Sequence, residues 1–381
     1  MGTFRKWKGL PVVGLLALLA LGVLAGCGSG LGSGSGAGSG GTGQGQGETK
    51  APAPKIMGPA GPQMLYITGY DRIFAVDAQK DELVAEIPAK GPTRDIVFTA
   101  DGSKLYVNHK DRKEIAVIDT AKQETVESFA IKDEDKVRTD IFGIALGTKQ
   151  DKLYVHVTRS KRLLNELKVL PPKVMEVDLA TKQVVRSWEV PYGVHNLMTL
   201  DNGRELAVFG RSLFKLDLDS GKLTEVAKLL DAPDPANVLF LWNTDREGNG
   251  MAAIPAYTLK TATGQVKLEL LTVKNQDGVF NRIDLGEPLG FFSAVMSPDH
   301  KKAYLAMNEI AAYDLTTAKL LKKISSPKGT YYGITISPDG KKLYLAGGGP
   351  DLTVLNADTL EVVKTIELSA DAMGVRFVAR K

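Results

Sequence analysis

The chain repeats a turn-and-strand pattern, which reads Ser337-Pro338-Asp339-Gly340-Lys341-Lys342-Leu343-Tyr344-Leu345 in its last copy. An Asp-Gly pair between β-runs is a strong hairpin signal, because Gly and Asp tolerate positive φ angles. The alternation after the turn is typical of a strand with one buried face. Three earlier turns of this kind, each followed by strand residues, lie at residues 100–103, 201–203 and 297–300. The pattern predicts a repetitive all-β fold.

A second turn recurs farther along most copies, after a strand that ends in an acidic or amide residue. Such a side chain accepts hydrogen bonds from nearby backbone N–H groups and so fixes the turn. The residues are Asp119, Asp178, Asp217, Asp314 and Asn356. Two turn types and four strands thus recur about every 40 residues, which is the period of propeller blades.

We count seven such units. The first occupies residues 64–88, and the others begin near Arg94, Asp140, Gly193, Ala236, Gly290 and Thr330. The first unit lacks an innermost strand, whereas the chain ends in a strand at residues 374–378 that has no partners of its own. We infer that this strand completes the first blade and removes the exposed edges of an open sheet. Residues 63–381 are therefore predicted to form an all-β domain, a seven-bladed β-propeller closed by the C-terminal strand, with a β-sandwich or two domains as alternatives.

The N-terminus carries the features of an export signal. Three basic residues precede an apolar stretch at residues 10–24, which has the length of a signal peptide and is short for a transmembrane helix. Cys27, the only cysteine of the chain, follows Leu24-Ala25-Gly26. This arrangement resembles the lipobox of bacterial lipoprotein precursors. The resemblance implies that residues 1–26 are removed and that lipid is attached to the Cys27 thiol. The alternative is an ordinary secretory signal with a chance cysteine.

A linker of biased composition follows the cysteine. Residues 28–47 consist almost entirely of Gly, Ser, Ala, Thr and Gln, which bury too little apolar surface to offset ordering. We expect residues 27–62 to be a disordered tether with a span of roughly 30 Å. Gly28 does not resemble an inner-membrane retention signal. The protein is thus predicted to be anchored to the outer face of the cell membrane, or to the outer membrane in a cell that has two.

Charge and cysteine content narrow the classes of partner. The formal net charge is +4, and three of the positive charges but no acidic residue lie in the signal, which leaves the mature chain near +1. Such a balance gives no bulk electrostatic argument for nucleic-acid binding. Because the single cysteine is the expected anchor, no disulfide is expected.

Two blades carry longer segments between their second and third strands, at residues 159–173 and 257–265. In a four-stranded blade these loops share one face of the ring with the connections between blades. Residues 162–170 are compatible with a helical turn or with an extended hairpin arm. Aromatic residues gather around the segments that open on this face: Phe142, Trp242, Tyr257, Phe291, Phe292, Tyr331 and Tyr332. We interpret them as candidates for binding a partner, with core packing between blades as the alternative.

Catalytic signatures are absent from the sequence. His109, His156, His195 and His300 fall in different blades without metal-ligand spacing, and no Cys-x-x-Cys-His haem site or Gly-x-Ser-x-Gly elbow occurs. For His195, at the start of an innermost strand, a structural role is favoured. We therefore expect no catalytic residue, metal site or cofactor in this chain.

The last repeat, including Asn356-Ala357-Asp358-Thr359, resembles the YVTN class of bacterial surface propellers. A closer resemblance, in the same order over most of residues 64–378, is to the β-propeller subunit of quinohemoprotein amine dehydrogenase. Besides the long segment of the third blade, it rests on Phe142-Gly143, Val238-Leu239, Trp242-Asn243, Pro255-Ala256-Tyr257-Thr258, Phe292-Ser293-Ala294-Val295, Tyr331-Tyr332, Ala346-Gly347-Gly348 and Asp351-Leu352.

This resemblance implies a non-catalytic subunit of a periplasmic enzyme that oxidises primary amines. In that family the quinone lies in a small partner subunit and the haems in another, and the propeller supplies a platform and part of the cavity wall. The lipid anchor and the Gly-rich tether depart from the family's pattern. Two other functions stay open, namely a stand-alone lipoprotein propeller that binds a protein or an envelope polymer, and a self-sufficient propeller enzyme.

Overall fold

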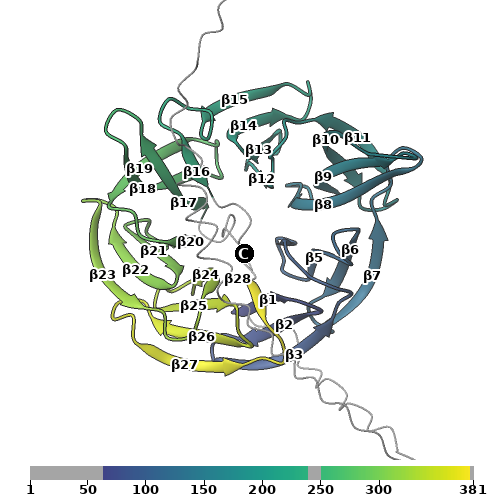
Figure 1. The fold of residues 1–381 in the computed structure, drawn as a ribbon. Helices are drawn as coiled ribbons and strands as arrows, with labels where there is room; N and C mark the ends of the chain where they lie inside the picture. Colours follow the sequence, from purple (N-terminus) through teal and green to yellow (C-terminus); the bar gives the residue numbers. More distant parts are fainter. Residues whose placement is uncertain (1–62, 239–249, 378–381) are drawn as a thin grey trace, which may run out of the picture. The chain divides into compact units, whose positions relative to one another are not determined.

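The computed structural model describes residues 63–238 and 250–377 of the chain. Within these residues, 28 strands form seven four-stranded sheets, which are arranged as blades around a ring (Figure 1). The prediction of an all-β, seven-bladed propeller is confirmed. In the same residues there is no helix long and apolar enough to cross a membrane.

Each blade runs from an innermost strand to an outermost one. The innermost strands of blades one to seven are β28 (Ala372–Phe377), β4 (Ile96–Phe98), β8 (Val137–Leu146), β12 (Asn196–Thr199), β16 (Ala236–Val238), β20 (Phe291–Met296) and β24 (Tyr331–Ile336). The second strands are β1 (Met64–Gly69), β5 (Lys104–His109), β9 (Lys152–Arg162), β13 (Glu205–Phe209), β17 (Met251–Lys260), β21 (Lys302–Met307) and β25 (Lys342–Gly347). The third are β2 (Arg72–Asp77), β6 (Glu114–Asp119), β10 (Leu167–Asp178), β14 (Ser212–Asp217), β18 (Gln265–Lys274), β22 (Glu309–Asp314) and β26 (Asp351–Asn356). The outermost are β3 (Glu82–Pro88), β7 (Glu124–Ala130), β11 (Val184–Glu189), β15 (Leu223–Lys228), β19 (Phe280–Gly286), β23 (Lys319–Ser325) and β27 (Val362–Glu367).

The C-terminal strand closes the ring, as the sequence predicted. β28 pairs antiparallel with β1, and Val375 lies opposite Ile67. The backbone N–H of Gly374 donates to Oγ1 of Thr68 at 2.9 Å. Val375 is fully buried in an apolar cluster that combines residues of blades one and seven. The first and last parts of the chain thus share one sheet.

The hydrophobic core lies between neighbouring blades. Among the described residues, seven apolar clusters each combine residues of two adjacent blades. Polar contacts reinforce the seam between blades seven and one, where the Tyr344 hydroxyl donates to Oδ1 of Asp81 at 2.7 Å. Nζ of Lys342 lies 2.6 Å from the other carboxylate oxygen of Asp81. The ring is therefore held by packing across every blade boundary.

The recurrent turns form as their chemistry predicts. Oδ1 of Asp314 accepts hydrogen bonds from the backbone N–H groups two and three residues later, at 2.7 and 3.0 Å. Oδ1 of Asn356 makes the same pair of bonds, both at 2.9 Å. Gly340, in the Asp-Gly turn of the last blade, has a φ of 73°, which suits a residue without a side chain.

The long segment of blade three is an arm built from β8, β9 and β10. β9 and β10 pair as far as their tip, where Arg162 lies opposite Leu167. β8 lies beside β9, with Val137 opposite Lys161. Of the two alternatives for residues 162–170, the extended hairpin is found and the helical turn is wrong. Proline at 171 and 172 disfavours a helix there, because proline lacks the N–H and restricts the residue before it to extended conformations.

Candidate functional site

One face of the ring carries both insertions, and we call it the arm face. It holds the loops between second and third strands and the connections between blades, since successive strands of a blade alternate in direction. The arm of blade three belongs to it, as does the hairpin of blade five, whose last pair is Lys260 with Gln265. The Asp-Gly turns lie on the opposite face.

The tip of the arm is apolar and exposed. Leu164 is 96% exposed, Leu167 64% and Val169 62%. Isolated apolar side chains are common on protein surfaces, whereas several together on a projecting hairpin are typical of an interaction site.

The base of the arm is held rigidly by a buried ion pair. Nε of Arg159, on β9, lies 2.5 Å from Oδ2 of Asp133, and both side chains are almost fully buried. Nη2 of Arg159 reaches Glu134 at 2.8 Å, and Nη1 donates to the carbonyl oxygen of Pro171 on β10. Removing one partner of a buried pair is strongly destabilising, by about 3–5 kcal/mol. The arm therefore presents its apolar tip from a fixed base.

The aromatic residues predicted to bind a partner divide into two groups, and the first packs into the core. Phe291 and Tyr331 are almost fully buried between blades, and the Tyr331 hydroxyl shares a hydrogen bond with Thr353 at 2.7 Å. The half-buried Tyr257 donates to the carbonyl oxygen of Leu289 at 2.8 Å. These three pack and bond as core residues do, which was the alternative interpretation. Trp242 lies outside the described residues.

The second group is partly accessible. Phe292 and Tyr332 lie with ring centroids 5.8 Å apart and planes inclined at 38°. Phe142 lies under the guanidinium of Arg112, whose Cζ is 4.2 Å from the ring centroid. Of the predicted residues that the structure describes, these three are half-buried, as Tyr257 is, and their accessible parts can make contacts at a surface.

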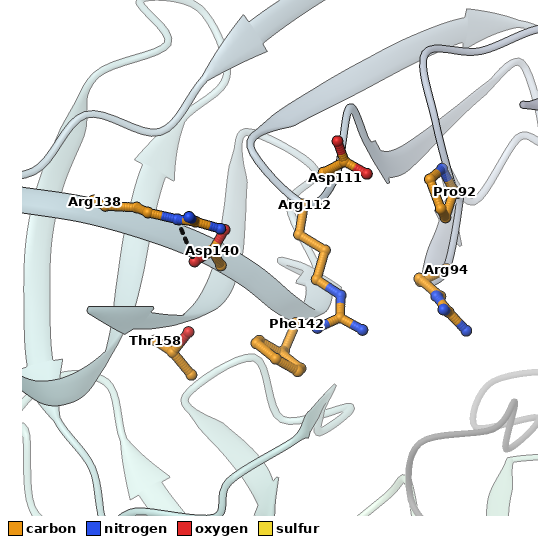
Figure 2. Close-up of a pocket in the computed structure, with 8 residues that line it drawn as sticks. All are labelled: Pro92, Arg94, Asp111, Arg112, Arg138, Asp140, Phe142 and Thr158. Atoms are coloured by element: carbon orange, nitrogen blue, oxygen red, sulfur yellow. Dashed lines mark hydrogen bonds and ion pairs between the residues drawn. The ribbon is translucent and has the colours of Figure 1, made fainter. Parts of the chain in front are cut away.

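Phe142 also lines a pocket between blades two and three that the sequence did not reveal. Its volume is about 320 Å³, and it is lined by Pro92, Arg94, Asp111, Arg112, Arg138, Asp140, Phe142 and Thr158 (Figure 2). These residues come from the connection before β4, the loop between β5 and β6, and strands β8 and β9. No local motif links them, because the packing of two blades brings them together.

The pocket concentrates positive charge. Arg138 and Asp140 form a bidentate pair, with nitrogen–oxygen distances of 2.9 and 3.0 Å. Burial lowers the pKa of Arg94, and the nearby charge of Arg112 lowers it further. Burial also lowers the pKa of Arg112, although Asp140 opposes that effect. Both guanidinium groups stay charged at neutral pH.

A buried histidine lies behind the pocket. The imidazole of His156, on β9, is fully buried, and its ring centroid is 6.1 Å from that of Phe142. Among the residues that the structure describes, neither of its ring nitrogens has a hydrogen-bond partner. Burial lowers the pKa of His156 to about 3, with a smaller contribution from His195. Within residues 63–238 and 250–377 no group of acidic, histidine or cysteine side chains is placed to hold a metal ion.

No family model and no curated protein matches the sequence of this chain. Solved structures of β-propeller proteins do share its fold. A hydrazine synthase of Kuenenia stuttgartiensis matches with a TM-score of 0.55 and 17% identity, over 85% of this chain and 98% of that chain. The dihydro-heme d1 dehydrogenase NirN matches with a TM-score of 0.56 and 16% identity, over 87% and 78%. A functionally unknown protein from Desulfotomaculum acetoxidans gives 0.57 and 13%, over 84% and 99%. At such identities the likeness shows the propeller fold alone.

Proposed function

We propose that this chain is an exported, lipid-anchored propeller that acts as a non-catalytic platform subunit of an amine-oxidising complex of the quinohemoprotein amine dehydrogenase type. The observation that carries the platform role is the arm, whose apolar tip projects from a rigid base. In the proposal, quinone and haem belong to partner subunits. This chain contributes the arm and the accessible aromatic residues Phe142, Phe292 and Tyr332.

Two further observations support this role. The ordered series of short motifs described above runs through blades three, five, six and seven, including the segment that forms the arm. The fold also occurs in proteins named as a hydrazine synthase and a dihydro-heme d1 dehydrogenase, so propellers of this architecture exist in proteins concerned with nitrogen or haem chemistry. Fold likeness alone does not carry function. For that reason the proposal depends on the arm.

Substituting the two most exposed leucines of the tip, as Leu164→Ser with Leu167→Ser, is expected to weaken partner binding about ten- to a hundredfold. Truncating interface anchors typically costs about 1–2 kcal/mol or more each. The measurement is co-purification of quinone- and haem-bearing subunits from the native host, with the affinity then determined on the purified components. The control is Val185→Ser with Val363→Ser, two residues 50% and 53% exposed on the outermost strands β11 and β27.

The outcomes of this experiment separate the candidate functions. Loss of quinone- and haem-bearing subunits in the arm variant alone supports the proposal. Arm-dependent binding of a partner that carries neither group would replace it with the stand-alone binding propeller. Unchanged binding by the arm variant would contradict a docking role for the arm. Amine oxidation by the isolated chain would contradict a non-catalytic role.

Replacing Cys27 with Ser is expected to move the protein from the membrane fraction to the soluble one. The thiol is the proposed site of lipid attachment, and durable anchoring needs more than one acyl chain. Fractionation of the native host, with a lipoprotein of known location as the marker, measures the shift. A Cys27→Ser variant that stays in the membrane pellet at the parent's level would contradict the anchor.

A further inference from the structure

We propose that the pocket between blades two and three binds the carboxylate group of a small organic ligand through Arg94 and Arg112. This site is additional to the docking role of the arm and needs no partner subunit. Its residues lie within blades two and three and the connection between blades one and two.

The pocket offers two cationic groups to one opening. Figure 2 shows Arg94 and Arg112 extending side by side from separate segments, while Arg138 turns to Asp140. The bidentate Arg138–Asp140 pair neutralises both of its members. Among the described residues that line the pocket, Asp111 is the one further carboxylate, so these side chains together carry a net positive charge. Two guanidinium groups close together in a partly desolvated site repel each other, and a bound anion relieves that repulsion.

The guanidinium of Arg112 has N–H donors available for a ligand. In the part of the chain that the structure describes, its guanidinium forms no hydrogen bond or ion pair, and its face lies on the ring of Phe142. A guanidinium has five N–H donors, and stacking on a ring leaves those at its edge available. The pocket is therefore built to hold a planar acceptor group.

The backbone that carries Arg112 is strained. Lys110, Asp111 and Arg112 have φ angles of 52°, 52° and 67°, so three successive residues with side chains adopt the left-handed conformation. The carbonyl oxygen of Arg112 accepts a hydrogen bond from the N–H of Ile141 at 2.7 Å, which fixes the turn to β8. Left-handed residues other than glycine carry a free-energy penalty, and such strain is concentrated at binding sites.

The size and the lining of the pocket favour an organic carboxylate over an inorganic anion. A volume of about 320 Å³ corresponds to roughly ten water molecules, and it lies at the lower end of the range for small-molecule sites. Pro92 and Phe142 give the pocket an apolar wall, and Thr158 also lines it. A planar carboxylate matches the fork of a guanidinium, and the remainder of a small ligand fits against that wall.

Calorimetric titration of the mature chain tests the site. The probes are acetate, benzoate and succinate, each with its neutral amide, and inorganic phosphate. We expect at least one carboxylate to bind, and to bind more tightly than its amide and than phosphate. Arg112→Gln and Arg94→Gln should each weaken that carboxylate about ten- to a hundredfold, because each removes a charge-assisted hydrogen bond. Arg211→Gln is the matched control, since Arg211 occupies the equivalent loop of blade four and pairs with Asp231.

Thermal melting without ligand separates binding from packing. Arg112→Gln removes the repulsion with Arg94, so its melting temperature should equal or exceed the parent's. A lower melting temperature with unchanged carboxylate affinity would assign Arg112 to packing on Phe142 and overturn the proposal. Carboxylates that bind no better than their amides, or phosphate that binds better than all of them, would also overturn it. Because the titration uses the chain alone, loss of this site leaves the docking role of the arm untouched.

Discussion

A chain that lacks residues 372–381 is expected to unfold or aggregate, because the deletion removes β28. β1 then loses the strand that pairs with it from Leu65 to Gly69. Each buried backbone group left without a partner costs about 1–3 kcal/mol, and exposing a side chain such as Val375 costs roughly 1.5–3 kcal/mol. Several such terms together match the whole stability of a typical domain, about 5–15 kcal/mol. An exposed strand edge also invites association between chains.

Thermal melting and size-exclusion chromatography measure this effect. Deleting residues 378–381 alone is the control, since these residues follow β28 in the chain. The longer deletion should show no cooperative transition, or one many degrees lower, together with aggregated material. An unchanged melting temperature and a monomeric profile for the longer deletion would contradict closure of the ring by β28.

Features set by local chemistry were predictable from the sequence. The Asp-Gly turns and the turns at Asp314 and Asn356 depend on side chains that bond to their own backbone, so the residues themselves reveal them. The closing strand was predictable from the number of strands in each repeat, because a first blade of three strands requires a fourth. The face that bears both insertions followed from the alternation of strand direction within a blade.

Features set by packing between blades were not predictable in the same way. Neighbouring residues of a strand point to opposite faces, so in Phe291-Phe292 and Tyr331-Tyr332 one ring enters the core and the other does not. Without the register of the strand, the sequence does not say which ring is buried. The pocket at Arg94 and Arg112 joins residues of different segments, and no spacing in the sequence marks it.

The free energy of unfolding is expected to fall as the pH is lowered from about 7 to about 3, and His156 should account for much of the fall. Its pKa is lowered by burial to about 3 in the folded state, against about 6.5 in an unfolded chain. Between these values the unfolded state binds the proton and the folded state does not. The contribution of His156 to stability is therefore fully present above pH 6.5 and decreases as the pH falls, by up to about 1.4 kcal/mol for each pH unit.

Urea unfolding at pH 7, 6 and 5 isolates this contribution, because carboxylates with ordinary or lowered pKa values stay ionised over most of that range. The expected loss from His156 is roughly 2 kcal/mol between pH 7 and pH 5. His156→Leu should flatten the dependence by that amount. At pH 7 it should be no less stable than the parent, since it removes two buried ring nitrogens that lack hydrogen bonds among the described residues.

His109 and His195, whose pKa values burial also lowers, leave a residual slope of the same sign. His300→Asn, in a turn between strands, controls for the loss of a histidine outside the core. Equal slopes for His156→Leu and the parent would show that this imidazole does not set the acid sensitivity of the propeller.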